Sequence, residues 1–168
     1  MEFRLPEPSD EEMLASYVQE HLQCGETFIH ASLGLADMDY ATWCAMVARN
    51  ATEGFERWGR TLTELCLAEG RLVGLVGIRY ELPPDLSARY GDIGYGVRPS
   101  ERRRGHGTEI LRHALAVARV RGLTQVTLGC YRDNLASAAT IRKCGGTFLC
   151  ENDDMEPGRP CRYFTIRL

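Results

Sequence analysis

A glycine-rich junction between an expected strand and an expected helix constrains this chain most. The apolar run from Ile93 to Val97 predicts a strand, and apolar residues at helical spacing begin after Thr108. Three arginines and then Gly105-His106-Gly107 lie between them. Glycine has no Cβ, so the backbone there can turn tightly and approach a ligand closely. The pattern alone leaves open a structural turn and a binding loop.

An anion such as a diphosphate would suit this junction. The first N–H groups of a helix have no acceptor within the helix, and the helix dipole favours negative charge at that end. Arg102, Arg103 and Arg104 add guanidinium donors beside it.

Two spaced motifs resemble the GNAT superfamily of acyl-CoA-dependent N-acyltransferases. Arg102-x-x-Gly105-x-Gly107 is similar to the Q/R-x-x-G-x-G/A signature of that family. Asn134-x-x-Ser137, followed by Lys143-Cys144-Gly145-Gly146, is similar to its second conserved block. Two motifs in the right order are more specific than one, and together they cover about the C-terminal half of the chain. The resemblance implies an α+β (α/β) fold: a mixed, mostly antiparallel sheet of six to seven strands, a central parallel pair, and about four helices.

Length and composition limit the classes of protein to which this chain could belong. A chain of 168 residues that is 44% hydrophobic predicts a single domain over residues 1–168. The net charge of −3 gives no overall attraction for nucleic acid or anionic membrane. Seven scattered cysteines without a C-x-x-C pair predict neither a disulfide framework nor a zinc knuckle. With no signal peptide or apolar span in view, we expect a cytoplasmic protein.

The apolar periodicity predicts the order of the other elements. We expect a strand over Glu2–Leu5, a helix capped by Ser9 or Asp10 and a second helix capped by Asp37 or Asp39. A hairpin of residues 62–68 and 72–82, a strand over 90–97, a helix from Thr108 to Gly122 and a strand over 124–131 should follow. The last expected elements are a helix capped by Asp133 or Asn134 that runs to Lys143, and a hairpin of residues 147–151 and 162–167. Glycines at 91, 94 and 96 weaken a strand unless a ligand or another backbone comes close. In the similar family this strand splays from its parallel neighbour and its backbone binds the pantetheine arm.

The resemblance also implies a cosubstrate, acetyl-CoA, and the residues that bind it. The backbone around Gly96-Val97 would polarise the thioester carbonyl, and the N–H groups from Arg103 to Thr108 would hold the diphosphate. Asn134 would contact the pantetheine or a bound water. The expected set is Tyr95, Gly96, Val97, Arg102, Arg103, Arg104, Gly105, His106, Gly107, Thr108, Asn134 and Ser137.

The sequence leaves open which residues would act as general acid and general base. Many relatives carry a tyrosine as general acid where this chain has Ile141. Tyr131 and Tyr95 are candidate substitutes, and solvent could also protonate the thiolate. Asp92 and Glu81 could face the acceptor cleft as the base, or be solvated charges at strand ends. The four histidines, at 21, 30, 106 and 113, show no metal spacing, so no metal is expected.

The leading hypothesis is an N-acetyltransferase that moves an acetyl group from acetyl-CoA to a primary amine of a small molecule, by direct attack in a ternary complex. One alternative acceptor is a protein N-terminus or lysine. Another alternative is a non-catalytic acyl-CoA sensor, because the usual tyrosine is missing. In the similar family the N-terminal helices wall the acceptor site, so Trp43 is either a substrate contact or core. A homodimer is common among similar folds and is a candidate assembly.

Overall fold

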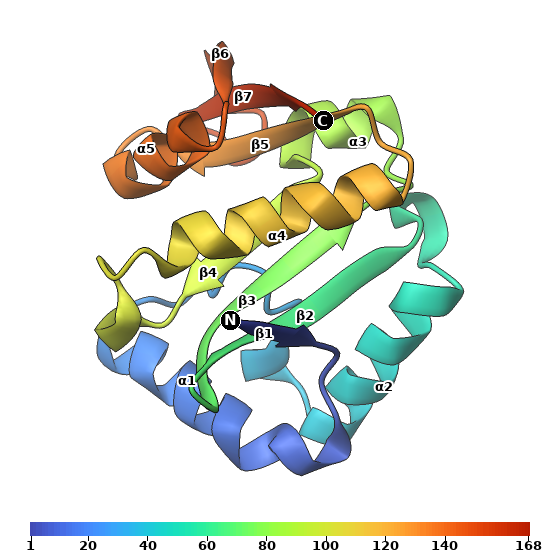
Figure 1. Ribbon diagram of the computed structural model, residues 1–168, viewed down its shortest axis with the longest axis vertical. Helices are drawn as coiled ribbons and strands as arrows, with labels where there is room; N and C mark the ends of the chain where they lie inside the picture. Colours follow the sequence, from blue (N-terminus) through green and yellow to red (C-terminus); the bar gives the residue numbers. More distant parts are fainter.

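Seven strands and five helices make up the computed structural model, which describes all 168 residues (Figure 1). In chain order they are β1 (Glu2–Arg4), α1 (Glu11–Gln23), α2 (Tyr40–Thr52), β2 (Thr61–Ala68), β3 (Arg71–Arg79), α3 (Pro84–Tyr90), β4 (Ile93–Val97), α4 (His106–Val120), β5 (Gln125–Tyr131), α5 (Leu135–Lys143), β6 (Thr147–Asn152) and β7 (Cys161–Arg167). None of the helices combines the length and apolar character needed to cross a bilayer.

The strands form two antiparallel sheets that meet at one point. The first has the order β1-β2-β3-β4 and the second the order β5-β7-β6. Near the start of β4, the Asp92 N–H donates to the Thr127 carbonyl (2.7 Å) and the Thr127 N–H donates to Asp92 Oδ2 (2.6 Å). The mixed, mostly antiparallel fold is therefore confirmed. The expected parallel pair, β4 and β5, does not form a ladder, and the sheet is split between these two strands.

Local sequence signals explain most element boundaries. Asp39 caps α2 by accepting from the Thr42 N–H, and Asn134 caps α5 by accepting from the Ser137 N–H. Two predicted boundaries are wrong. β3 ends at Arg79 instead of continuing to residue 82, and α3 takes up Pro84–Tyr90, which makes five helices where about four were expected. Proline stops a strand, but it is also favourable at the first position of a helix, and here it starts one.

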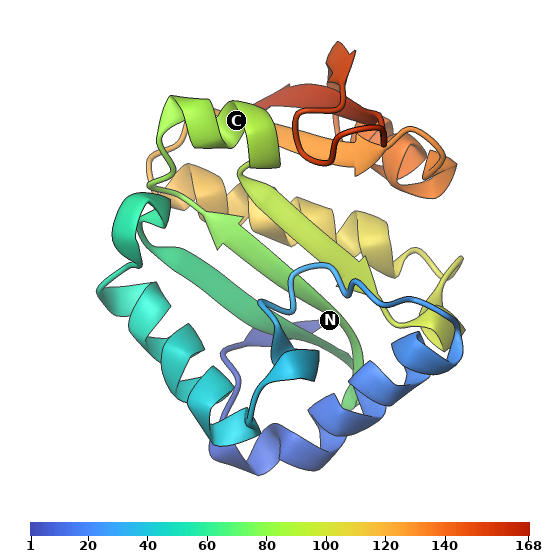
Figure 2. The ribbon, with the colours of Figure 1, turned by 180° about the vertical axis from the view of Figure 1, so that it is seen from behind.

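Apolar residues are buried on both faces of the first sheet. α4 crosses one face, and α1 and α2 cover the other (Figures 1 and 2). Ile110, Leu111 and Ala114 of α4 belong to the core on the first face, whereas Tyr17 and Trp43 belong to the core on the second. Trp43 is fully buried and its indole N–H donates to the Ser32 carbonyl (2.6 Å). Trp43 is therefore a core residue and not a substrate contact.

The approach of β3 to β4 provides a test of this packing. A Cβ added at Gly74 would lie 2.4 Å from the Gly96 carbonyl oxygen, which is backbone and cannot move freely. A Cβ at Gly77, on the same strand, would meet nothing closer than 3.8 Å. We expect Gly74→Ala to lower the free energy of unfolding by about 1–3 kcal/mol, and Gly77→Ala to change it by about 0.5 kcal/mol or less. Urea denaturation of both variants measures this, and equal losses would contradict the close approach.

Candidate active site

The split between β4 and β5 leaves one edge of β4 without a partner strand. The Arg79 N–H donates to the Asp92 carbonyl and the Arg98 N–H to the Val73 carbonyl, both at 2.8 Å. Because main-chain groups alternate along an antiparallel strand, the even-numbered residues of β4 bond to β3. The main-chain groups of Tyr95 and the N–H of Val97 therefore point into the gap, which is where a linear ligand could bind as an extra strand would.

A row of free N–H groups lies beyond the end of β4. α4 begins at His106, after Gly105 with a φ of 90°. The N–H groups of residues 103–107 donate to no acceptor in the chain, and the first bonds of the helix are from Thr108 and Glu109 to the Gly105 carbonyl. Consecutive free N–H groups at the start of a 15-residue helix form an anion site. That a diphosphate binds there stays a prediction.

The three arginines contribute less positive charge than their number suggests. Arg102 makes a two-pronged ion pair with Glu26 (2.6 and 2.8 Å), and its Nε donates to the Val97 carbonyl (3.1 Å). Arg104 pairs with Glu101 at 3.1 Å. Arg103 has no ion-pair partner and adopts a positive φ of 63°. Two of the three guanidinium groups are thus neutralised, and main-chain N–H groups supply most of the attraction for an anion.

Glu101 organises the other cations of this loop. Its side chain is buried and lies 3.1 Å from Arg71 Nε and 3.7 Å from His106 Nε2, in addition to Arg104. Because a buried carboxylate needs compensation, these contacts fix the loop that precedes α4. Sequence analysis missed both Glu101 and Glu26: Glu101 lies only three positions from Arg104, whereas no local pattern connects Glu26 with Arg102.

Side chains of β4 and α5 form the wall of the gap on the α4 side. A Cβ at Gly107 would lie 3.6 Å from both the Tyr95 ring and the Val97 side chain, so both side chains pack against the start of α4. The Tyr95 hydroxyl lies 3.3 Å from Ser137 Oγ. Burial raises the pKa of Tyr95 to about 12, so its hydroxyl keeps its proton at neutral pH. Asn134 uses its carbonyl oxygen on the Ser137 N–H, which leaves its amide NH₂ group for a ligand.

The two carboxylates expected near the acceptor have partners within the protein. Asp92 is buried and accepts from the Thr127 N–H, and burial raises the pKa of its carboxyl group. Glu81 pairs with the Arg60 guanidinium and also accepts from the Arg60 N–H (3.0 Å). Side-chain hydrogen bonds from Arg60 lower the pKa of Glu81. A role as base would require either group to leave these contacts, and it stays a prediction.

Tyr131 lies at the end of β5, across the gap from β4. Its hydroxyl donates to Glu156 Oε2 (2.8 Å), and the Arg159 guanidinium stacks 3.4 Å from the centre of its ring. Burial, followed by the hydrogen bond to Glu156, raises the pKa of Tyr131. Its role as general acid also stays a prediction. Ile141, at the position of the family tyrosine, is fully buried.

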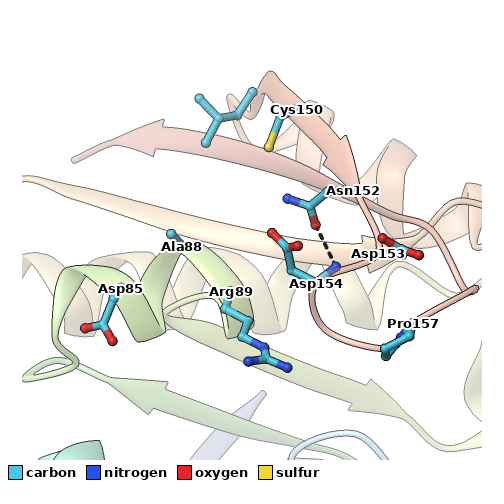
Figure 3. A pocket seen from close by; sticks show the side chains of 9 residues that line it. Asp85, Ala88, Arg89, Cys150, Asn152, Asp153, Asp154 and Pro157 are labelled. Carbon is cyan, nitrogen blue, oxygen red and sulfur yellow. Dashed lines mark hydrogen bonds between the residues drawn. The ribbon is translucent and has the colours of Figure 1, made fainter.

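An open hollow of about 530 Å³ lies between α3 and the turn that joins β6 to β7 (Figure 3). Three carboxylates, Asp85, Asp153 and Asp154, line it with Arg89. Asp85 is paired with Arg57 (2.7 Å), and Asp153 accepts from the Gly158 N–H (2.9 Å). The lining is more acidic than basic. No group of three or more His, Cys, Asp or Glu side chains is placed to hold a metal ion.

The ion pair between Arg102 and Glu26 predicts a specific dependence of stability on pH. Hydrogen bonds from Arg102 lower the pKa of Glu26 from 4.5 to about 2. A carboxylate with a lowered pKa stabilises the fold above its unfolded pKa, and this contribution is lost as the pH falls through the folded pKa.

We therefore expect Glu26→Gln to be less stable than the wild type at pH 7, with a difference that shrinks as the pH falls from about 4.5 towards 2. Glu12→Gln, on the exposed side of α1, is the matched control and should keep most of the wild-type pH dependence. Urea unfolding across this range tests the pair. A constant difference between Glu26→Gln and the wild type would contradict it.

Comparisons with known proteins identify the family. A family model described as an acetyltransferase (GNAT) domain matches residues 1–147. No curated protein matches the chain. Among solved structures, the fold is similar to a ribosomal-protein-alanine N-acetyltransferase from Brucella melitensis (TM-score 0.72, 17% identity, 100% of both chains).

Two further structures have the same fold. One is an acetyl transferase from Salmonella typhimurium that modifies the N-terminal serine of a 50S ribosomal subunit protein (TM-score 0.72, 16% identity, 99% of this chain and 94% of that chain). The other is a microcin C7 self-immunity acetyltransferase in complex with acetyl-CoA and AMP (TM-score 0.72, 14% identity, 99% of this chain and 91% of that chain). At these identities the structures show the fold, and the family model shows the membership: this chain belongs to the GNAT acetyltransferase family.

Proposed function

We propose that residues 1–168 form a single acetyl-CoA-dependent N-acetyltransferase domain that acetylates a primary amine. The observation that carries this proposal is the row of free N–H groups at residues 103–107, placed where the open edge of β4 ends. We also infer a reducing compartment, the cytoplasm, because the chain carries seven scattered cysteines.

The residues present fit acetyl-CoA along its length. The N–H groups of residues 103–107 would hold the diphosphate, with Arg103 as the unpaired cation beside them. The pantetheine arm would bond to the open edge of β4 and reach the hydroxyls of Tyr95 and Ser137. The microcin C7 self-immunity acetyltransferase has this fold and was solved in complex with acetyl-CoA, which supports this choice of cosubstrate.

Bound acetyl-CoA supplies the activated acyl group, and the chain supplies orientation. The Val97 N–H, which points into the gap, is the donor we assign to the thioester carbonyl. Holding the diphosphate at one end and the carbonyl at the other fixes the acyl carbon against an amine that approaches from the side opposite α4. Direct attack in such a ternary complex gains most of its rate from this positioning.

Two acceptor classes remain in the proposal. The first is the N-terminal amine of a protein, because the Salmonella acetyl transferase modifies the N-terminal serine of a ribosomal protein and the Brucella structure is a ribosomal-protein-alanine N-acetyltransferase. The open, acidic hollow beside α3 would suit a cationic segment of such a substrate. The second is a small amine, and the microcin C7 self-immunity acetyltransferase shows that this fold can bind a small molecule, AMP, together with acetyl-CoA.

A panel of acceptors tests the function and separates the two classes. We expect thiol release from acetyl-CoA with a set of short peptides that have free N-termini, and no release when the same peptides are blocked at the N-terminus. Polyamines, amino acids and aminoglycosides are the small-molecule arm of the same assay. Turnover only in that arm would select the small-molecule acceptor. CoA binding without turnover on any amine would instead identify a non-catalytic sensor and contradict the enzyme.

Two glycines that flank α4 provide a matched test of the proposed diphosphate site. Gly105 and Gly122 have φ values of 90° and 93°, and a Cβ at either would touch nothing within 4 Å. Alanine is strained at a positive φ, so each substitution should cost about 1–2 kcal/mol of stability. Only Gly105 lies among the free N–H groups. We expect Gly105→Ala to weaken CoA binding at least about tenfold by calorimetry, as the loss of one charge-assisted hydrogen bond would. Gly122→Ala should bind CoA like the wild type, and equal affinities in both variants would contradict the assigned site.

A further inference from the structure

His30 lies across the gap between β4 and β5. The loop between α1 and α2 crosses the face of the first sheet opposite α4, near the end of β4 (Figure 2). The His30 carbonyl oxygen is 3.0 Å, and its Cβ 3.7 Å, from the position of a Cβ on Gly96. The imidazole ring lies 6.3 Å from the ring of Tyr131, centre to centre. His30 therefore rests on β4 and extends toward the end of β5, on the side from which an acceptor would enter.

The imidazole of His30 is held by packing and has no hydrogen-bond partner in the chain. The ring of Phe28 meets it edge-on, with centres 5.0 Å apart. His30 is partly exposed, and neither of its ring nitrogens is among the fully buried polar atoms that lack a partner. The pKa of His30 is lowered from 6.5, mainly because burial disfavours the charged imidazolium. Of the charged groups that face it, Glu26 raises this pKa, whereas Arg159, His21 and Arg102 lower it.

We propose that His30 is the base that accepts the proton of the acceptor amine, an inference that rests on the proposed acetyltransferase function. The amine nitrogen attacks the thioester carbon, so a C–N bond forms and the C–S bond breaks. The proton lost by the nitrogen passes to an unprotonated nitrogen of His30. The imidazolium then returns that proton to the departing thiolate. The products are the amide and CoA, and the imidazole is restored.

The surroundings distinguish His30 from the candidate bases Asp92 and Glu81 and from the candidate acid Tyr131. Asp92 and Glu81 are held by the Thr127 N–H and by Arg60, and Tyr131 donates to Glu156. His30 makes no such bond. A neutral imidazole at neutral pH is the protonation state that a base requires, and general acid–base catalysis of this kind contributes about 10²–10⁴ in rate.

The test compares two histidine substitutions in the full chain. We expect His30→Gln to lower kcat/KM by about 10²-fold or more, with CoA affinity by calorimetry unchanged. His113→Gln is the matched control: its imidazole stacks on Phe3 and bonds to Glu64 (2.7 Å), away from the gap. In the wild type both the amine and His30 must be unprotonated, so log kcat/KM should fall with a slope of two in acid, and His30→Gln should keep a slope of one. Imidazole added to His30→Ala should restore part of the rate.

Titration of the free protein gives a second readout. The ring proton resonances that disappear in His30→Gln should titrate below pH 6.5 in the wild type. A wild type that acetylates amines while His30→Gln keeps the slope of two would overturn the role of His30 and leave the proposed function standing. A wild type that acetylates no amine would overturn the proposed function, and the role of His30 with it.

Discussion

The contact between Asp92 and Thr127 is the constraint on which the active site depends. Two short hydrogen bonds, one through the main chain and one through the buried carboxylate, join β4 to β5 at the start of β4. Beyond that contact each strand pairs only on its other side, β4 with β3 and β5 with β7. Because β4 and β5 are joined only at this contact, main-chain N–H and C=O groups beyond it have no hydrogen-bond partner strand. The proposed cosubstrate would satisfy them.

At the proposed diphosphate site the main-chain N–H groups matter more than the arginines. Glu26 and Glu101 pair with Arg102 and Arg104, so two of the three arginine charges are offset and these contacts help to hold the loop before α4 in place. A rigid row of N–H groups loses little entropy when it binds an anion, whereas flexible arginines would have to be ordered first. The pair between Arg102 and Glu26 also links this loop to the segment that carries His30.

Sequence patterns predicted the features that arise locally. The glycine loop, the caps at Asp39 and Asn134, and the order of strands and helices all follow from short-range rules, and the structure has them. The features that were missed depend on distant residues. Glu26 is 76 positions from Arg102, and no spacing rule connects them. α3 was not predicted for a different reason: Pro83-Pro84 is typical both of the end of a strand and of the start of a helix.

The glycines of β4 show that one physical signal in a sequence can have more than one cause. Glycine in a strand indicates that a ligand or another backbone comes close. A Cβ on Gly74 would lie 2.4 Å from the Gly96 carbonyl oxygen, so Gly74 lets β3 and β4 come close. A Cβ on Gly96 would lie 3.0 Å from the His30 carbonyl oxygen, so the missing side chain of Gly96 admits the loop that carries His30. In the proposed arrangement this loop lies on the acceptor side, so Gly96 would serve the approach of the amine as well as the binding of the cosubstrate.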